Sequence, residues 1–239
     1  MPGGSTGCRL NVLTSIDYMQ SSMVAIRPPE YFPRLQYMAL VLEVDHFYIA
    51  DTFEFSRQSY HNRTKLRNPD GWHWITVPLA WGESTAPLID VSIQDNPIWK
   101  DKHWRAIMYD YRSTPYFEFY EDRFHTLFDE EWTTIGEFTS ASLERVCELL
   151  EIYTELIRLS ELDNPPFTFE AASETLPGGD LLCLPDTAEY NRQFAPGLEE
   201  LVFEEPVYRQ NFPGFESGMS VLDMLFNYGP ETVSLISEA

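Results

Sequence analysis

The sequence is poor in lysine, in cysteine and in long apolar runs, and each shortage argues against a class of protein. Lysine occurs only at positions 65, 100 and 102, and the 16 Lys and Arg face 38 Asp and Glu, which gives a formal net charge of −22. This balance argues against binding to nucleic acids or anionic membranes, because their phosphates require massed cations. An acidic, lysine-poor surface would also suit a salt-rich cytoplasm, where ions screen the charge repulsion.

The three cysteines, Cys8, Cys147 and Cys183, are widely spaced and form no CxxC pair, so the sequence supports neither a disulfide framework nor a zinc site. The start of the chain lacks a charged segment followed by an apolar core, and no run of about 18 apolar residues occurs. We therefore expect a cytoplasmic protein with free thiols and no membrane insertion.

Signatures of the common cofactor-binding and hydrolytic sites are also missing. There is no GxxxxGK[ST], GxGxxG, HExxH or GxSxG sequence, which argues against the usual phosphate-binding loop, dinucleotide fold, zinc protease and nucleophile elbow. The sequence thus assigns no metal, no cofactor and no oligomeric state.

Hydrophobic residues make up 44% of the chain and aromatic residues 15%, which is enough to build a sizeable core. Residues 1–22 are rich in Gly, Ser and Thr with few apolar positions, so we expect a flexible N-terminal arm there. The remaining residues, 23–239, are expected to form a single domain, because 239 residues fit one unit better than two.

The beginning of this domain has the pattern of a βαβ unit. An apolar strand at Met23–Ile26 ends at the Pro28–Pro33 loop, a helical period follows at Arg34–Glu43, and a second strand at Phe47–Ile49 leads into Asp51. A right-handed crossover of this length makes the two strands parallel. Ligands bind at the carboxyl ends of such strands, which are the Pro28–Pro33 loop and the segment after residue 51.

The rest of the chain is predicted to be mainly helical. Apolar residues recur at helical spacing over Ile98–Arg112, Tyr116–Phe128 and Ser142–Leu162, and Ser220 caps a last helix. The pattern predicts an α/β fold with an N-terminal βαβ-type sheet layer and a mainly helical C-terminal half.

Basic and amide side chains gather directly after the second strand. Arg57, Asn62 and Arg63 present guanidinium groups and an amide that suit a carboxylate or phosphate held by two hydrogen bonds. The alternative is that these cations form salt bridges with the surplus acids. Lys65 and Arg67 continue the cluster into a hairpin whose turn is set by the Asn-Pro-Asp-Gly sequence at 68–71.

Two side chains are candidates for moving a proton. Asp51 lies at a strand end, where a carboxylate is placed to act as a general base or a metal ligand, although most such acids cap loops. His103 lies on a helix beside Trp104 and Arg105, and its alternative role is that of a packed core residue. His61 also has polar neighbours in the sequence.

Three blocks of the sequence resemble the WbqC-like protein family, in order and from about Val24 to Ile236. They read SYHNRTKLRNPDGWHWITVPL, PIWKDKHWRAIMYDYRSTPYFEFYEDRF and PVYRQNFPGFESGMSVLDMLFNYGP. The first carries Asn62 and Arg63, and the second carries His103. The loop Ile26–Pro33 departs from the family, because many relatives have Gln-Pro followed by His or Tyr at its start. Before the last helix this chain has Gly-Met-Ser where Asn-Leu-Ser is usual.

The resemblance implies a role in the synthesis of surface polysaccharides such as O-antigen. It implies an enzyme, a transferase or ligase, that joins an acyl or aminoacyl group to an amino sugar through an amide bond. Its partner would be a nucleotide-linked amino sugar or another anionic small molecule. The alternative is a non-catalytic protein that binds or assembles a glycan precursor. A third alternative is that the family blocks are core residues and helix caps.

Asn62, Arg63, His103, Tyr208, Gln210 and Ser220 fall in the family blocks, whereas Asp51 and Arg57 are candidates from their positions after the second strand; together they give the predicted roles. Asp51 and His103 would be catalytic, while the substrate would be bound by Arg57, Asn62, Arg63, Tyr208, Gln210 and Ser220. The opening strand, loop, helix and strand also resemble nucleotidyltransferase-type and Rossmann-like folds, although the paired histidines of the former are missing here.

Overall fold

A parallel five-stranded sheet lies at the centre of the molecule. The computed structural model describes residues 22–80, 86–176 and 179–239. The strands follow the order β5-β2-β1-β6-β7, and every pair in this sheet is parallel. Their bounds are β1 Met23–Arg27, β2 His46–Ile49, β5 Glu155–Arg158, β6 Asp180–Cys183 and β7 Glu199–Glu200.

Both faces of the sheet are covered, as parallel sheets require. Side chains alternate along each strand, so Ala25 and Phe47 point into the larger core while Val24, Ile26 and Tyr48 point into a smaller one. The larger core contains residues of α1 and of the helical C-terminal half, and the smaller one contains residues of α5 and α6. The short apolar strands are therefore buried on both sides.

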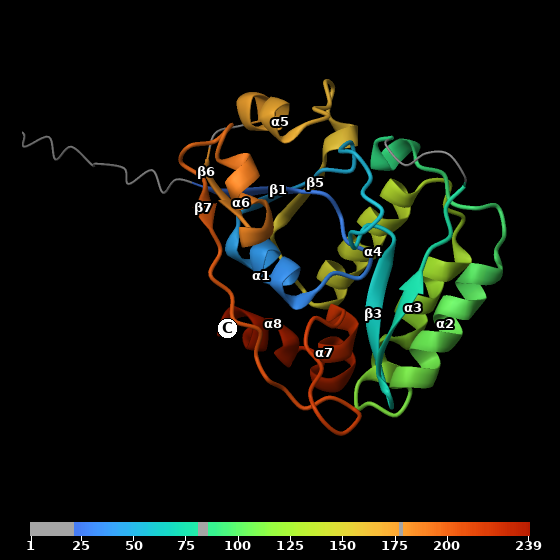
Figure 1. Cartoon of the computed structure of the whole chain (residues 1–239). Coiled ribbons are helices and arrows are strands. Elements are labelled where there is room, and N and C mark those ends of the chain that lie inside the picture. Colours follow the sequence, from blue (N-terminus) through green and yellow to red (C-terminus); the bar gives the residue numbers. More distant parts are fainter. Residues whose placement is uncertain (1–21, 81–85, 177–178) are drawn as a thin grey trace, which may run out of the picture.

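The helices surround this sheet and a separate hairpin (Figure 1). Their bounds are α1 Leu35–Glu43, α2 Ile98–Tyr111, α3 Phe117–Asp129, α4 Ile135–Leu149, α5 Phe169–Thr175, α6 Pro185–Asn191, α7 Val221–Tyr228 and α8 Glu231–Ser237, with 3-10 turns at η1 Leu88–Asp90 and η2 Leu159–Glu161. The structure thus confirms the predicted α/β class, with a parallel sheet layer and a mainly helical C-terminal half.

The hairpin consists of β3, Arg63–Asn68, and β4, Gly71–Thr76. It packs against α2 and α7 and does not join the central sheet (Figure 1). Gly71 in its turn has a φ of +122°, a backbone conformation that glycine adopts without strain. The predicted turn is therefore found where the Asn-Pro-Asp-Gly sequence places it.

The opening βαβ unit is also found as predicted, with Val24 paired to His46 and Arg27 to Ile49 in parallel register. The predicted helix over Ser142–Leu162 is wrong in its bounds. The helix α4 begins earlier, at a capping box in which Thr134 and Glu137 bond to each other's backbone N–H groups, and it ends at Leu149. The residues after it form β5, because pairing with β2 buries Leu156 and Ile157 beside Phe47 and Tyr48.

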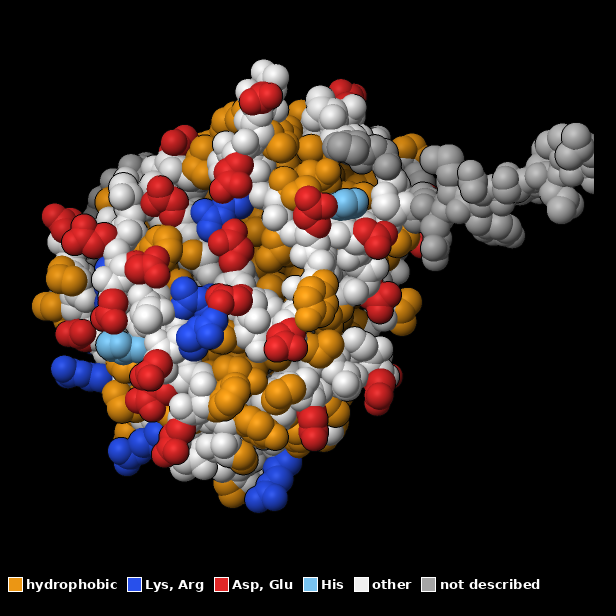
Figure 2. Space-filling model, turned by 180° about the vertical axis from the view of Figure 1, so that it is seen from behind, with side chains coloured by type: hydrophobic (Ala, Val, Ile, Leu, Met, Phe, Trp, Pro, Cys, Tyr) orange, Lys and Arg blue, Asp and Glu red, His pale blue; other side chains and the backbone are white. Residues whose placement is uncertain are grey.

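Acidic side chains are spread over the surface, with the cations in small groups between them (Figure 2). No helix of the described residues is both long enough and apolar enough to cross a membrane. The predicted N-terminal arm lies outside the described residues, apart from its last position. Of the three cysteines, Cys147 and Cys183 are free thiols in the buried interior.

Candidate functional site

The order in which strands are added to the sheet reverses at β1. This reversal creates a crevice at the carboxyl ends of the strands. From β1 the chain passes outward to β2, with β5 at the far edge, and it later returns on the other side of β1 to form β6 and β7. The loops that leave the carboxyl ends of β1 and β6 therefore separate from each other. In open α/β sheets, ligands bind in the crevice at such a switch point.

A cavity of about 330 Å³ lies at this crevice, and we call it the switch-point pocket. Its walls come from the end of β1 and the following loop, from the residue that precedes α1, from the loop before the hairpin and from α6. The lining residues are Arg27, Pro28, Glu30, Arg34, Gln58, Ser59, Tyr60, His61, Asp186 and Thr187.

An ion pair between Arg27 and Asp186 spans the pocket from β1 to α6. Arg27 Nη1 and Nη2 donate to the two oxygens of Asp186 at 2.9 and 2.8 Å, and Nη1 also donates to Thr187 Oγ1 at 3.3 Å. Burial opposes the charge of Arg27, but the hydrogen bond to Asp186 and the nearby Glu30 carboxylate raise the pKa of Arg27 above its ordinary value. The same pairing outweighs burial at Asp186 and lowers the pKa of its carboxyl group.

A second ion pair continues the wall toward the hairpin. Arg34 Nη2 and Nε donate to the two oxygens of Glu30 at 2.6 and 3.1 Å, and Glu30 is only 4% exposed. The Arg34 guanidinium lies over the Tyr60 ring at 3.9 Å from its centroid. Two arginines and two carboxylates therefore meet in one small pocket, where each guanidinium is already arranged to hold a planar anion.

His61 contributes a neutral imidazole to the pocket. Burial, with the charge of Arg27, lowers the pKa of His61 to about 4 although Glu30 opposes the shift. Its Nδ1 accepts the backbone N–H of Ser56 at 3.2 Å, so at neutral pH the ring proton is on Nε2. That Nε2–H donates to no described residue, which leaves it free to donate to a ligand.

Several residues predicted to bind substrate lie instead in a buried polar network, which we call the Arg67 cluster and in which only Asp223 Oδ1 lacks a partner among the described residues. The network consists of Arg67, Tyr111, Tyr208, Gln210 and Asp223, and all five are buried. Gln210 Oε1 accepts from Arg67 Nε at 2.9 Å, and the Tyr208 hydroxyl donates to Asp223 Oδ2 at 2.8 Å. Burial raises the pKa of Asp223 to about 6. The cluster holds the C-terminal segment onto the hairpin.

Other predicted substrate-binding residues also bond to the protein itself. Ser220 caps α7 by accepting from the Leu222 N–H at 3.2 Å and donates to the Phe32 carbonyl at 3.0 Å. The Asn62 amide donates to the Val77 carbonyl at 3.0 Å.

Arg63 is partly exposed, and its Nε and Nη2 donate to the carbonyls of Ser59 and Gln58 at 3.2 and 2.9 Å. Its guanidinium lies beside the pocket without lining it.

The two residues predicted to be catalytic lie apart from this pocket. Asp51 follows β2 and is 2% exposed, and its Oδ1 accepts the Ser160 N–H at 3.0 Å while its Oδ2 accepts the Ser160 hydroxyl. His103 is 5% exposed and bonds to Tyr31 at 3.0 Å and to the Thr76 carbonyl at 3.2 Å. Burial lowers the pKa of His103 to about 4, although the hydrogen bond to the Thr76 carbonyl opposes the shift.

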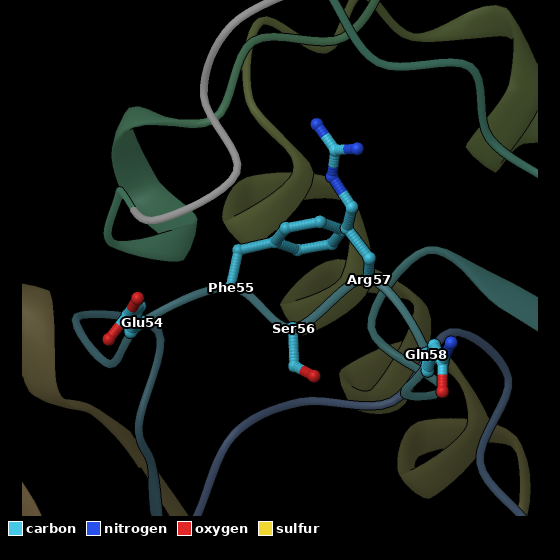
Figure 3. Close-up of a pocket in the computed structure, with 5 residues that line it drawn as sticks. All are labelled: Glu54, Phe55, Ser56, Arg57 and Gln58. Carbon is cyan, nitrogen blue, oxygen red and sulfur yellow. The ribbon is translucent and has the colours of Figure 1, made fainter.

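Arg57 lies on an open hollow next to the switch-point pocket. Residues 54–58 line this hollow of about 670 Å³, and Figure 3 shows the Arg57 guanidinium extended away from Glu54 and Gln58. The side chain is exposed and makes no hydrogen bond or ion pair with a described residue. Of the residues predicted to bind substrate, Arg57 and Arg63 are therefore the two that lie near the pocket with exposed cations.

The structure thus brings together a set that differs from the predicted one. Asp51, His103 and the Arg67 cluster lie in different parts of the core, whereas Arg27, Glu30 and Asp186 meet in the pocket. The Pro28–Pro33 loop, which the strand-end argument selected, contributes Pro28 and Glu30 to this pocket. Asp186 follows a strand that no sequence pattern marked, so only the pairing of β6 with β1 reveals it.

No group of three or more His, Cys, Asp or Glu side chains that could hold a metal ion occurs within the described residues. The polar groups of the pocket are instead two guanidinium groups, one imidazole, one phenol, one amide, two hydroxyls and two carboxylates that pair with the arginines. This set is suited to an anion with a neighbouring polar group.

Comparisons with known proteins agree with the resemblance seen in the sequence. The family model described as the WbqC-like protein family matches residues 28–235. The uncharacterized protein Rv1507c of Mycobacterium tuberculosis is 27% identical over 231 residues, which cover 87% of this chain and 94% of that protein. No solved structure gives a significant match.

Proposed function

The chain belongs to the WbqC-like protein family, and from that premise and the geometry of the switch-point pocket we propose that it is an enzyme of surface-polysaccharide synthesis. The reaction we propose joins an acyl or aminoacyl group to the amino group of a nucleotide-linked amino sugar. The observation that carries the proposal is that two arginines and a neutral histidine with a free N–H line one cavity at the switch point.

Arg27 would hold an anionic group on the sugar or on the acyl part of the substrate, which is the part that enters the pocket. Arg27 already binds the planar carboxylate of Asp186 through two hydrogen bonds, and a substrate carboxylate or phosphate presents the same geometry. The Asp186 side chain is 48% exposed, so it has room to turn toward solvent when a ligand anion replaces it. The displaced carboxylate would then lie beside the ligand, where it is placed to accept a proton from an attacking amine.

His61 would act as a hydrogen-bond donor. When an amine attacks a carbonyl carbon, negative charge develops on the carbonyl oxygen, and a preorganised N–H donor stabilises that charge. Because burial keeps the imidazole of His61 neutral, its Nε2–H supplies this bond without carrying a net charge into the cavity. We further propose a cytoplasmic location, in keeping with the free thiols of Cys147 and Cys183.

The alternative function is that of a protein that binds a glycan precursor without catalysis. It is favoured by the ion pairs of the pocket, in which each arginine is bound to a carboxylate. Arg27 and Arg34 are both neutralised by carboxylates within the cavity, and a binding protein needs no further group. The two functions differ in the role of His61, because a mere binding site would not use it in a bond-forming step.

The test is to incubate the protein with a panel of amino-sugar nucleotides and activated acyl donors, and to detect amide products by mass spectrometry. We expect His61→Gln to lower the rate about 10²- to 10³-fold, as the loss of one oxyanion donor does elsewhere. Binding of the sugar nucleotide, measured by titration calorimetry, should change far less. Arg27→Gln should weaken that binding by at least about tenfold.

The matched control is His125→Gln, which changes an exposed histidine on α3. Equal rates in the His61 and His125 variants would contradict the role of the pocket. Tight binding without any amide product would favour the binding protein, and the absence of heat with every sugar nucleotide would contradict both.

A further inference from the structure

Cations and aromatic rings alternate along the side of the hairpin that faces solvent. We call this surface the cation-aromatic strip, and its members are Arg34, Tyr60, Arg63, Lys65, Trp72 and Trp74. The Arg63 guanidinium lies 4.3 Å from the centroid of the Trp74 ring, and Lys65 Nζ lies 4.2 Å from that of Trp72. The rings follow one another closely, with centroids 5.4 Å apart from Tyr60 to Trp74 and 5.7 Å apart from Trp74 to Trp72.

The register of the hairpin places Arg63, Lys65, Trp72 and Trp74 on one face, together with Arg67, which is buried against the C-terminal segment. Lys65 lies opposite Trp74 in the antiparallel pair, and directly opposed residues share a face. The other face carries Leu66 and Ile75, which are buried in the core. The strip is therefore the solvent side of an otherwise amphipathic hairpin, and its Trp72 is 40% exposed.

Two cations of the strip lack an acidic partner, which is unexpected in a chain with 38 Asp and Glu. Arg63 donates to two backbone carbonyls, and neither it nor Lys65 forms an ion pair with a described residue. Glu205 accepts the Gly218 N–H at 2.9 Å, and burial raises the pKa of Glu205 although this hydrogen bond and the charges of Lys65 and Arg34 oppose the shift. Unpaired cations next to exposed rings are the features of a surface that binds an anion with a flat aromatic part.

The strip continues into the switch-point pocket. Arg34 and Tyr60 belong to both, because Arg34 lies over the Tyr60 ring and both residues line the cavity. A ligand longer than the pocket would therefore extend from His61, past Tyr60, onto the two tryptophans.

We propose that the strip binds the nucleoside diphosphate part of an activated sugar, with the sugar itself in the switch-point pocket, an inference that rests on the proposed function. The diphosphate would lie against Arg63 and Lys65, since guanidinium and ammonium groups form charge-assisted hydrogen bonds with phosphate oxygens. The base would stack on Trp72, as bases stack on aromatic side chains in nucleic-acid-binding proteins. Lys65 now lies over the Trp72 ring, and its flexible side chain would move to the phosphate when the base arrives.

Other occupants fit the strip less well. A nucleic acid brings many phosphates and would meet a protein of net charge −22, which repels it. A neutral oligosaccharide would stack on the tryptophans but would leave Arg63 and Lys65 without a counter-charge. An acidic oligosaccharide is the remaining competitor, and the experiment separates it from the nucleotide.

The test measures binding of nucleoside diphosphates that carry no sugar, namely UDP, CDP, GDP and dTDP, by titration calorimetry with the full-length protein. We expect at least one of them to bind, and Trp72→Ala and Arg63→Gln each to raise its Kd at least tenfold. Trp72→Tyr should largely restore binding, because it keeps a stacking ring. The controls are Phe119→Ala, which removes a ring that is 76% exposed on α3, and Arg105→Gln, which removes an exposed cation on α2. Both should leave the Kd within about twofold.

Equal Kd values in all variants, or no binding of any nucleoside diphosphate to the folded protein, would overturn the proposal. Binding of trigalacturonate that depends on Trp72, with no binding of nucleotides, would also overturn it and would assign the strip to an acidic glycan.

The experiment is independent of the reaction in the pocket. His61→Gln should leave the Kd for the nucleoside diphosphate unchanged, since the imidazole contacts only the transferred groups. If the nucleotide binds as expected and no amide product forms, the proposed function fails while this inference stands. If amide forms and Trp72→Ala has no effect on nucleotide binding, the inference alone fails.

Discussion

The Arg67 cluster and the switch-point pocket are built from the same kinds of side chain. They differ in whether their polar groups are buried within the protein or accessible from a cavity. In the Arg67 cluster, Arg67 donates to Gln210 and to carbonyls of the hairpin and the C-terminal segment, and it is 2% exposed. In the pocket, Asp186 is half exposed and His61 keeps an N–H that has no acceptor among the residues the structure describes. The one oxygen of the cluster that lacks a partner among the described residues, Asp223 Oδ1, is fully buried, whereas the open groups of the pocket line a cavity that a ligand can enter.

The largest expected difference between the two regions is in stability. Arg67→Ala should lower the free energy of unfolding by about 3–5 kcal/mol, because at least two buried acceptors lose their donors at about 1–3 kcal/mol each. Urea unfolding followed by circular dichroism measures this loss. Arg105→Ala is the matched control, since its side chain is exposed, and it should cost less than about 0.5 kcal/mol. Similar losses in the two variants would show that the cluster does not support the fold.

The second difference is in the response of the Arg67 cluster to pH. The folded-state pKa of Asp223, about 6, lies above the ordinary value of 3.8 for an aspartate, so between these two pH values the folded protein holds a proton that the unfolded chain has lost. The stability that this bound proton contributes is fully present below pH 4 and is lost as the pH rises through about 6. Asp223→Asn removes it while keeping an acceptor for Tyr208. The variant should therefore gain about 2–3 kcal/mol relative to the parent between pH 4 and pH 7, measured by urea unfolding at each pH.

The pocket should respond to pH in the opposite direction. The pKa of His61 is lowered to about 4 from 6.5, so the unfolded chain binds a proton that the folded protein does not. Stability from this residue is present above pH 6.5 and is lost as the pH falls toward 4. His61→Gln should thus gain stability relative to the parent as the pH falls through this range, which urea unfolding at each pH measures. A gain in the same direction as that of Asp223→Asn would contradict the assignment.

The smallest expected effect is that of salt. Acids outnumber cations by 38 to 16, so raising the salt concentration from low to molar should screen the repulsion and raise the melting temperature by about 2–4 °C per kcal/mol gained. The loss caused by Arg67→Ala should not change with salt, because that side chain is buried. Nucleotide binding to the cation-aromatic strip should weaken with salt. A melting temperature that does not depend on salt would contradict the idea that the acidic surface is adapted to a saline environment.

Local sequence patterns predicted the parts of the fold whose contacts are close along the chain. The turn after Asn68 and the cap at Ser220 depend on neighbours within a few positions, the βαβ unit joins two strands through a single short helix, and all three were found. The segment after Leu149 was misread because Leu156 and Ile157 fit a helical period as well as a strand. Pairing with β2 decided between the two.

The candidate site was predictable in its place but not in its members. The sequence showed where the first strand ends, and therefore which edge of a parallel sheet binds ligands. It did not show that Tyr208 and Gln210 point into a buried network, because hydrogen-bond partners such as Arg67 lie 143 positions away. A tyrosine and a glutamine suit a buried structural network as well as they suit a substrate-binding site.

The sequence by itself determined the acidic surface, the βαβ opening and the family to which the chain belongs. Only the tertiary structure decided which polar side chains are closed within the protein and which remain open to a ligand. The physical reason is that this outcome depends on pairs distant in sequence, such as Arg27 and Asp186, which lie 159 positions apart. They meet because β1 and β6 are adjacent and parallel, so their carboxyl ends reach the same edge of the sheet.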